Sequence, residues 1–220
     1  MLASRAPEEV VVAGRKQFDV ERALDSAMET FWEHGYDGSS MSMLTAATGL
    51  GKGSLYGTFG TKEQLFQRCL TRYGELYRTA YEHALESTDP VDAVRGFFET
   101  MLDRMLDPQL PGGCLIAQSA AFATELDSVG RAMVEEILRE QRASVEAMFE
   151  RAGLPSVRAA ALAEYVVAVR QSLAVLHRAG RREGDLRQVV DLACQTVAAS
   201  VAALVTPQDR ARPRAGSQTP

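Results

Sequence analysis

The chain has 220 residues and a formal net charge of −5, with 46% hydrophobic and 24% charged residues. This composition is typical of a soluble globular protein of one domain or two small ones, long enough to bury a core without disulfides or metals. No apolar run approaches the ~20 residues that span a bilayer, and the first sixteen residues lack the apolar stretch of a secretory signal. Three cysteines without CxxC spacing favour neither disulfides nor a zinc site, so we expect a cytoplasmic protein without metal, cofactor or membrane partner.

The spacing of hydrophobic residues predicts helices along nearly the whole chain, and no alternating strand of convincing length occurs. The first helix follows a flexible arm of residues 1–16, has Asp19 as its candidate N-cap and ends at Gly35. The others are expected at roughly residues 41–48, 52–59, 62–81, 91–106, 114–124, 129–152, 157–179 and 186–205. Residues 206–220 are expected to be a disordered tail. The predicted fold class is therefore all-α, with about nine helices.

Two short helices joined by a glycine and packed on a longer first helix are typical of a DNA-reading helix-turn-helix. Gly49 can adopt the positive φ of the turn, and Leu55 and Phe59 are spaced to anchor the second short helix. The motif covers about residues 40–59. The net charge alone argues against a nucleic-acid ligand, but residues 38–62 hold no acidic residue and two of the three lysines, Lys52 and Lys62.

The residues in and around this motif follow a specific order. They read Phe31-Trp32-Glu33-His34-Gly35-Tyr36, Ser40, Ala46-Ala47-Thr48-Gly49-Leu50, Gly51-Lys52-Gly53-Ser54-Leu55-Tyr56 and Phe59-Gly60-Thr61-Lys62-Glu63. Over residues 18–66 this order and spacing resembles the TetR family of bacterial one-component repressors. The resemblance implies a DNA-binding domain, residues 17–64 here, followed by a helical ligand-binding and dimerisation domain, residues 65–205.

The resemblance also implies roles for single residues. Ser40 matches a hydroxyl residue that contacts phosphate at a helix N-terminus, Tyr56 a tyrosine whose phenol bonds to phosphate, and Lys62 a lysine that binds the same strand. The remaining expected contacts to base edges or phosphate lie on the outward side of the second short helix: Lys52, Gly53, Ser54 and Thr58. Two alternatives stay open, because Tyr56 can be a half-buried core aromatic and Ser54 a plain solvent-exposed residue.

The second short helix departs from the family pattern. Gly51 stands where a serine or threonine is usual, and Gly57 and Thr58 replace bulkier side chains. Two glycines within eight residues, at ~1 kcal/mol each relative to alanine, leave this helix marginal in the absence of DNA. The chain has no asparagine, and this helix has no glutamine, so the usual bidentate readers of adenine are missing. We expect ordering on DNA and direct base readout by few side chains.

The last two predicted helices are apolar on nearly every side, with runs such as Ala159-Ala160-Ala161-Leu162-Ala163. A helix that is apolar all round is buried all round, which in a chain of this length favours contact with a second copy. The resemblance implies a homodimer formed by these helices eight and nine. A dimer suits a palindromic double-stranded operator, although a large monomeric core stays an alternative.

The resemblance places a pocket for a small-molecule effector inside helices five to eight. The candidate apolar residues are Phe97, Phe98, Met101, Met105, Phe122 and Met148, with Gln118, Tyr165 and His177 as polar anchors. Gly113-Cys114-Leu115-Ile116 resembles the start of helix six in a subgroup of the family that includes electrophile and oxidant sensors. Cys114 at a helix N-terminus would favour a thiolate, whereas its apolar neighbours predict an inert buried cysteine. Any of these residues can equally be simple core.

Enzyme chemistry finds little support in the sequence. Gly51-Lys52-Gly53-Ser54 lacks the adjacent lysine and serine and the preceding strand of a P-loop, and no GxSxG, HExxH or GxGxxG motif occurs. The chain is therefore expected to be a ligand-released repressor. The alternative is a dimeric small-molecule or electrophile sensor of the same fold that no longer binds DNA.

Overall fold

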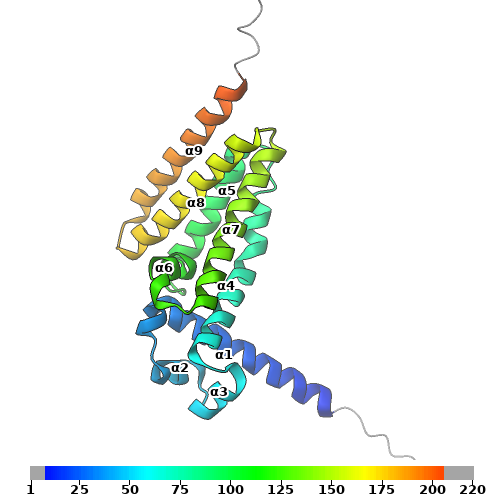
Figure 1. Ribbon diagram of the computed structural model, residues 1–220, viewed down its shortest axis with the longest axis vertical. Helices are drawn as coiled ribbons and strands as arrows, with labels where there is room; N and C mark the ends of the chain where they lie inside the picture. The colour runs from blue at the N-terminus through cyan, green and yellow to red at the C-terminus, as the bar shows by residue number, and fades with distance from the viewer. Residues whose placement is uncertain (1–7, 206–220) are drawn as a thin grey trace, which may run out of the picture.

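A computed structural model describes residues 8–205 of the chain, with side chains from Asp19 to Ala203. Within this range the chain forms nine α-helices, one short 3₁₀ helix and no strand, which confirms the predicted all-α fold (Figure 1). The first three helices are α1 (Glu8–Gly38), α2 (Met41–Thr48) and α3 (Lys52–Phe59). They gather at one end of the molecule, and the later helices run side by side away from them (Figure 1).

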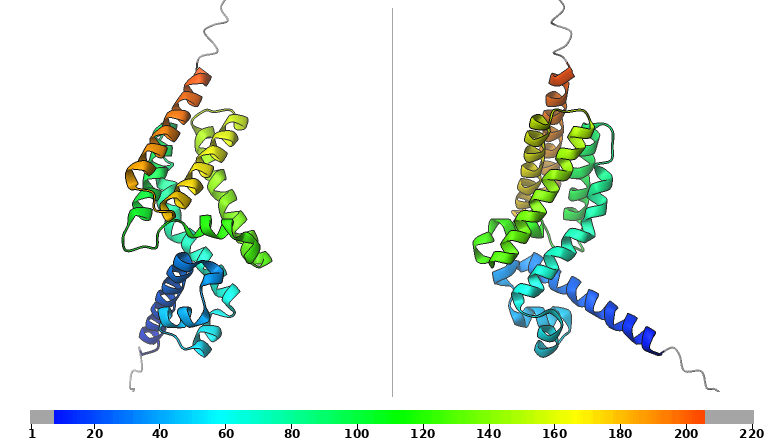
Figure 2. Two further views of the ribbon diagram at one scale, coloured as in Figure 1. Left: turned by 90° about the vertical axis from the view of Figure 1, so that its left-hand side faces the viewer. Right: turned by 45° about the vertical axis from the view of Figure 1, so that its right-hand side comes forward.

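The start of α1 differs from the prediction. Asp19 is an internal residue of α1 rather than its N-cap, because the helix begins at Glu8. Residues 8–18 contain no proline and a single glycine, so nothing in this stretch interrupts a helix. The predicted flexible arm is therefore wrong for residues 8–16, and residues 1–7 lie outside the described range. The first turns of α1 project away from the other helices (Figure 2).

The remaining helices begin and end close to the predicted positions. They are α4 (Lys62–Ala84), α5 (Pro90–Leu106), α6 (Leu115–Ala121), the 3₁₀ helix η1 (Ala123–Glu125), α7 (Ser128–Arg151), α8 (Ser156–Arg178) and α9 (Glu183–Val205). Thr61 and Gln64 form a capping box, in which each side chain bonds to the other residue's backbone N–H. Asp89 and Asp127 cap α5 and α7 without such a reciprocal bond, because only their own side-chain oxygens accept backbone N–H groups. The predicted disordered tail lies outside the described residues.

The core runs from the helix-turn-helix into the later helices without a break. Phe31 and Trp32 of α1 are fully buried against α4, where Phe66 and Tyr73 meet them edge to face. Arg72 of α4 clamps Asp25 of α1 with two hydrogen bonds of 2.8 and 3.2 Å. The long helix α4 therefore connects the helix-turn-helix to the rest of the protein.

Among the described residues, α8 is the one helix that is long and apolar enough by composition to cross a membrane. A core helix passes the same test. α8 packs against α5, α6, α7 and α9, and Arg170 in its middle is only 2% exposed. This packing explains the buried side of α8, which is about 44% of the apolar window.

Candidate nucleic-acid interface and effector cavity

The connection between α1 and α2 fixes the start of the helix-turn-helix. The buried Ser39 hydroxyl bonds to the carbonyl oxygens of Gly35, at 2.6 Å, and Thr30, at 3.2 Å. Ser40 then caps α2, and its exposed Oγ accepts a hydrogen bond from the Met43 backbone N–H at 3.2 Å. The N-terminus of α2 and the Ser40 hydroxyl are thus open to solvent, an arrangement that suits a phosphate group.

α3 is anchored by one side and open on the other. Leu55 and Phe59 are each 1% exposed, and Gly49 turns the chain into α3 with a φ of 68°. The residues on the solvent side are Lys52, Gly53, Ser54, Tyr56 and Gly57, with Thr58 half-buried at its edge. This side carries a cation and hydroxyl groups without an acidic residue, so it can approach a polyanion.

Lys62 begins α4 at the same end of the molecule as α3 (Figure 1). Its Nζ lies 4.4 Å from the centre of the Tyr36 ring, a cation–π contact. The Tyr36 hydroxyl donates to Glu63 at 2.9 Å, and burial together with this bond raises the pKa of Tyr36 above its ordinary value. The neutral Tyr36 ring thus packs against the Lys62 side chain. The Tyr36 hydroxyl binds Glu63, which is the acidic residue next to Lys62 in the sequence.

Packing against the described residues does not require glycine at the three glycine positions in and just before α3. A Cβ atom added at Gly51, Gly53 or Gly57 would meet no other atom within 4 Å. Gly53 and Gly57 are four residues apart in one helix, so they share a face. Their lack of side chains leaves the α3 backbone accessible from outside, as close approach to a DNA groove requires.

We predict that Gly53→Ala and Gly57→Ala each stabilise the free protein and weaken DNA binding. Alanine is favoured over glycine by up to about 1 kcal/mol inside a helix, whereas the added methyl group keeps the backbone away from DNA. Urea unfolding and operator titration measure the two effects. Gly74→Ala, also helical and free of neighbours within 4 Å, is the matched control and should stabilise without loss of DNA affinity. Unchanged operator affinity in both α3 variants would contradict the close approach.

The C-terminal end of α1 is where the later helices grip the helix-turn-helix unit. Regular helix geometry ends at Gly35, with φ 76° and ψ 174°. Arg178, in the last turn of α8, donates to the carbonyl oxygen of Trp32 at 3.0 Å and to that of Glu33. Gln118 of α6, with its amide oriented by its partners, donates to the same Trp32 oxygen at 2.8 Å and accepts from the Gly35 N–H at 3.2 Å. Both α6 and α8 are therefore tied to the backbone of α1.

A large cavity of about 930 Å³ lies mainly between α4 and α7. Its aromatic wall is formed by Tyr73, Tyr77 and Tyr81 of α4 and Phe97 of α5. Ile116 of α6 and Arg170 of α8 also line it. Exposed glutamates surround the solvent side: Glu75, Glu82, Glu136 and Glu140. A cavity of this size holds a drug-sized molecule, and apolar walls with a few polar groups are typical of small-molecule sites.

Comparison with known proteins identifies the two halves of the chain. Residues 23–69 match the model of "Bacterial regulatory proteins, tetR family". Residues 90–192 match "Transcriptional regulator LmrA/YxaF-like, C-terminal domain". The chain belongs to the TetR family.

Individual relatives of this TetR-family chain match from about half to nearly nine-tenths of its length. The HTH-type transcriptional repressor ComR of Escherichia coli is 26% identical over 79% of this chain and 86% of its own. The uncharacterized HTH-type regulator YezE of Bacillus subtilis is 36% identical over 48% of this chain and 55% of its own. A TetR regulator from Chloroflexus aurantiacus has a TM-score of 0.75 at 25% identity, covering 84% of this chain and 96% of its own. A CifR variant solved with 26-bp operator DNA shares the fold, with a TM-score of 0.71 at 24% identity over 88% and 98% of the chains.

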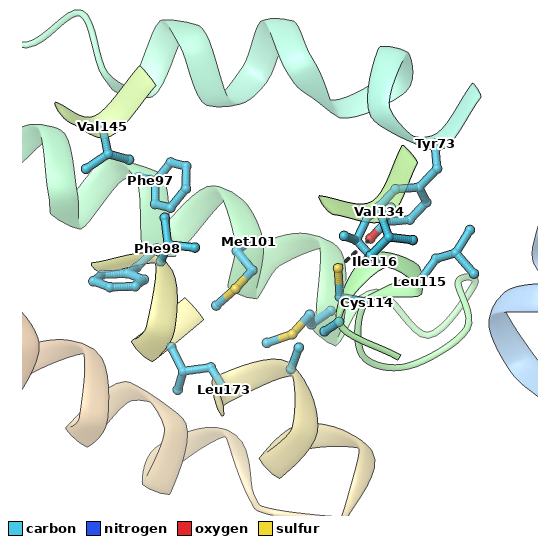
Figure 3. Close-up of a cluster of buried hydrophobic side chains, with 14 of the residues drawn as sticks. Tyr73, Phe97, Phe98, Met101, Cys114, Leu115, Ile116, Val134, Val145 and Leu173 are labelled. Atoms are coloured by element: carbon cyan, nitrogen blue, oxygen red, sulfur yellow. Dashed lines mark hydrogen bonds between the residues drawn. The ribbon is translucent and has the colours of Figure 1, made fainter. Parts of the chain in front are cut away.

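In this TetR-family chain the cavity is lined by few of the residues that we expected in the effector pocket, although it touches each of the helices five to eight. Of the ten predicted ligand residues only Phe97 lines it. Five others fill the core between helices, as Figure 3 shows for some of them: Phe98, Met101, Met105, Cys114 and Met148 are at most 3% exposed. Size and helical spacing, the signals behind the aromatic and methionine candidates, also describe ordinary core residues. The residues that the sequence analysis missed are the tyrosines of α4, because their helical spacing does not distinguish a cavity wall from core.

The other four predicted ligand residues lie elsewhere. Gln118 and Phe122 line a second hollow of about 130 Å³ beside Gly35, and Phe122 is 54% exposed. Tyr165 is half-buried against the core. His177 Nδ1 accepts the Gly113 N–H at 3.1 Å, and burial and Arg104 lower the pKa of His177. Gln118 and His177 thus position backbone rather than line the large cavity.

Cys114 is the N-cap residue of α6 and is 3% exposed. Its sulfur accepts the Tyr73 hydroxyl at 3.3 Å, the dashed line in Figure 3. Although burial raises the pKa of this thiol, the positive charges of Arg170 and Arg104 outweigh it and lower the pKa below its ordinary value. Cys69 and Cys194 are buried with raised pKa values, because burial disfavours their thiolates. In the described part of the chain no three His, Cys, Asp or Glu residues are grouped as metal ligands.

Proposed function

We propose that this protein is a cytoplasmic transcriptional repressor that binds a palindromic operator as a homodimer and leaves it when a small molecule binds. The observation that carries the proposal is the open side of α3, where Tyr56 and Lys52 stand beside glycines that no described residue covers. Ser40 and Lys62 would bind the DNA backbone on either side of α3. Relatives such as ComR, named a transcriptional repressor, support the direction of control.

The dimer would form through α8 and α9, which lie next to each other along one side of the molecule (Figures 1 and 2). Both helices leave large apolar side chains in solvent: Val157 is 85%, Val175 56% and Leu192 63% exposed. Exposed alanines such as Ala161 and Ala168 lie between them on α8 and would allow close approach of a second copy. Burial of such a surface favours association.

Release would start at the cavity and reach the DNA through α4. The cavity is lined by residues 70–82 of α4, and the same helix begins at Lys62. α6 and α8 hold the end of α1 through Gln118 and Arg178. A ligand that favours a tilted α4 would therefore displace α2 and α3 relative to the partner's copy. Coupling of about 1–3 kcal/mol is typical of such switches.

The direct test is binding of the purified protein to the DNA that flanks its own gene, over a salt series. Lys52 and Lys62 of two protomers would neutralise four phosphates. A plot of the logarithm of affinity against the logarithm of salt concentration should therefore have a slope of about −3 or steeper. Footprinting should show protection of a palindrome by one dimer. Absence of any saturable site would favour the dimeric sensor that has lost DNA binding.

A further inference from the structure

Two arginines lie inside the protein near the cavity. Arg104 of α5 is 6% exposed and Arg170 of α8 is 2% exposed. Arginine is almost never buried to this degree unless it is paired, because a desolvated charge is costly. The groups around these two side chains therefore need an explanation.

Neither arginine has a carboxylate partner among the described residues. The hydrogen bonds of Arg104 and Arg170 go to neutral groups, from Arg104 to the Tyr73 hydroxyl and from Arg170 to Gln141 Oε1 at 2.6 Å. The Nε and one terminal nitrogen of Arg104 and the Nε of Arg170 are buried without a hydrogen-bond partner, and Tyr81 interacts electrostatically with both arginines. The ion pairs in the described part of the chain involve other arginines.

Aromatic rings hold the two guanidinium groups in place of carboxylates. Arg170 lies 4.7 Å from the ring centre of Tyr81 and 5.5 Å from that of Phe97. The guanidinium carbon of Arg104 lies 4.8 Å from the ring centre of Tyr77. The ring centres of Trp32 and Tyr73 lie 5.1 and 5.3 Å from the same atom. Cation–π contacts offset part of the desolvation and leave the positive charge uncompensated.

This charge is directed at the cavity. Arg170 itself lines it, together with Tyr81 and Phe97. Arg104 does not line it, but contacts Tyr73 and Tyr77, which do. The glutamates of the lining are exposed to water, and two of them already pair with arginines at the surface, Glu82 with Arg78 and Glu136 with Arg139. The cavity thus has acidic side chains on its solvent-exposed side and a positive charge on its buried side.

We propose that the effector is an organic anion, with an aromatic or apolar body between the tyrosines of α4 and an acidic group that pairs with Arg170. This inference rests on the proposed function, of which it specifies the ligand class. The acidic group would pair with the guanidinium group of Arg170 where this side chain borders the cavity, and the charge of Arg104 would add to its attraction. The lowered pKa values of Tyr81 and Cys114, despite their burial, support a positive potential here. Such charge-assisted hydrogen bonds are the strong ones.

The test uses two fluorescent probes with the same aromatic skeleton, the sulfonate 1-anilinonaphthalene-8-sulfonate and the neutral N-phenyl-1-naphthylamine. The full-length protein should bind the anion saturably and at least about tenfold more tightly than the neutral probe. 2-Naphthoate should displace the bound anion more effectively than 2-naphthamide, which differs from it in charge. Equal or tighter binding of the neutral members of both pairs would overturn the proposal.

Variants locate the anion. Arg170→Met should weaken binding of the sulfonate at least about tenfold and leave binding of the neutral probe within about twofold. Arg181→Met removes an exposed arginine that lies between α8 and α9, outside the cavity lining, so both affinities should stay unchanged. Sulfonate binding that is unaffected by Arg170→Met would place the probe elsewhere and refute the assignment. Arg170→Lys, which keeps the charge, serves if the methionine variant does not fold.

The result is separable from the proposed function. A variant that cannot bind DNA, Tyr56→Ala/Lys62→Ala, should bind the sulfonate as the wild type does, because its changes lie in α3 and at the start of α4, outside the cavity. If the wild type binds no operator, its preference for the charged probe can therefore still be measured. Conversely, absence of a charge preference would refute the anionic effector while operator binding persists.

Discussion

The double variant Tyr56→Ala/Lys62→Ala should bind the operator at least about 100-fold more weakly than the wild type. Each side chain would contribute a hydrogen bond to phosphate in each protomer, and a bond to a charged group contributes about 1.5–3 kcal/mol. Tyr56 is 40% exposed, and Lys62 touches mainly the Tyr36 ring. The fold should therefore survive, with a loss of at most about 1 kcal/mol in unfolding free energy.

Gel-shift or anisotropy titrations over a salt series measure this effect. Removal of Lys62 from two protomers should also flatten the salt dependence of log affinity by about two units of slope. Arg181→Ala removes an exposed cation from the connection between α8 and α9 and should change neither affinity nor slope. A double variant that retains wild-type affinity would show that the DNA contacts lie elsewhere in the molecule.

Gly35→Ala should destabilise the protein by about 1–3 kcal/mol. The backbone at Gly35, with φ 76° and ψ 174°, lies in a region that essentially only glycine occupies. An added Cβ would also stand 3.1 Å from the Gln118 amide, which bonds to the Gly35 N–H and the Trp32 carbonyl. The strain and the crowding act at the same junction, so operator affinity should fall as well.

Urea unfolding of the two proteins gives the difference in free energy. Gly38→Ala, three residues further along, is the matched control, because its φ is not positive and its added Cβ would meet the His34 side chain at an ordinary 3.6 Å. It should change stability by less than about 0.5 kcal/mol, the usual range for surface substitutions. Equal destabilisation by the two substitutions would exclude backbone strain at Gly35 as the cause.

Local signals made most of the helix boundaries predictable. Ser40, Gly49 and the Thr61–Gln64 pair act on the backbone within four residues of themselves, and Gly49 has the positive φ that was predicted for it. The predicted start of α1 was wrong for the complementary reason. Asp19 is a good N-cap residue, but a cap acts only where the helix stops, and no residue between Glu8 and Asp19 stops it.

The cavity could not be predicted because it depends on where packing fails. Phe98 and Tyr81 have the same type of spacing along their helices, yet Phe98 is fully buried in the core while Tyr81 lines the cavity. The burial of Arg104 and Arg170 could not be predicted from the sequence for another reason. Arginine is usually a surface residue, and only the three-dimensional arrangement shows that these two lack carboxylates.

The length of α4 sets how small the motion of the switch can be. Its 23 residues, at about 1.5 Å rise each, make a rod about 34 Å long, with Lys62 at one tip and the cavity along the other half. A tilt of about 5° around the far end carries the Lys62 tip through about 3 Å, as far as a whole hydrogen bond is long. In the proposed switch the helix would therefore act as a lever arm that turns a displacement of a few tenths of an ångström at the Tyr81 end of the cavity into loss of a phosphate contact.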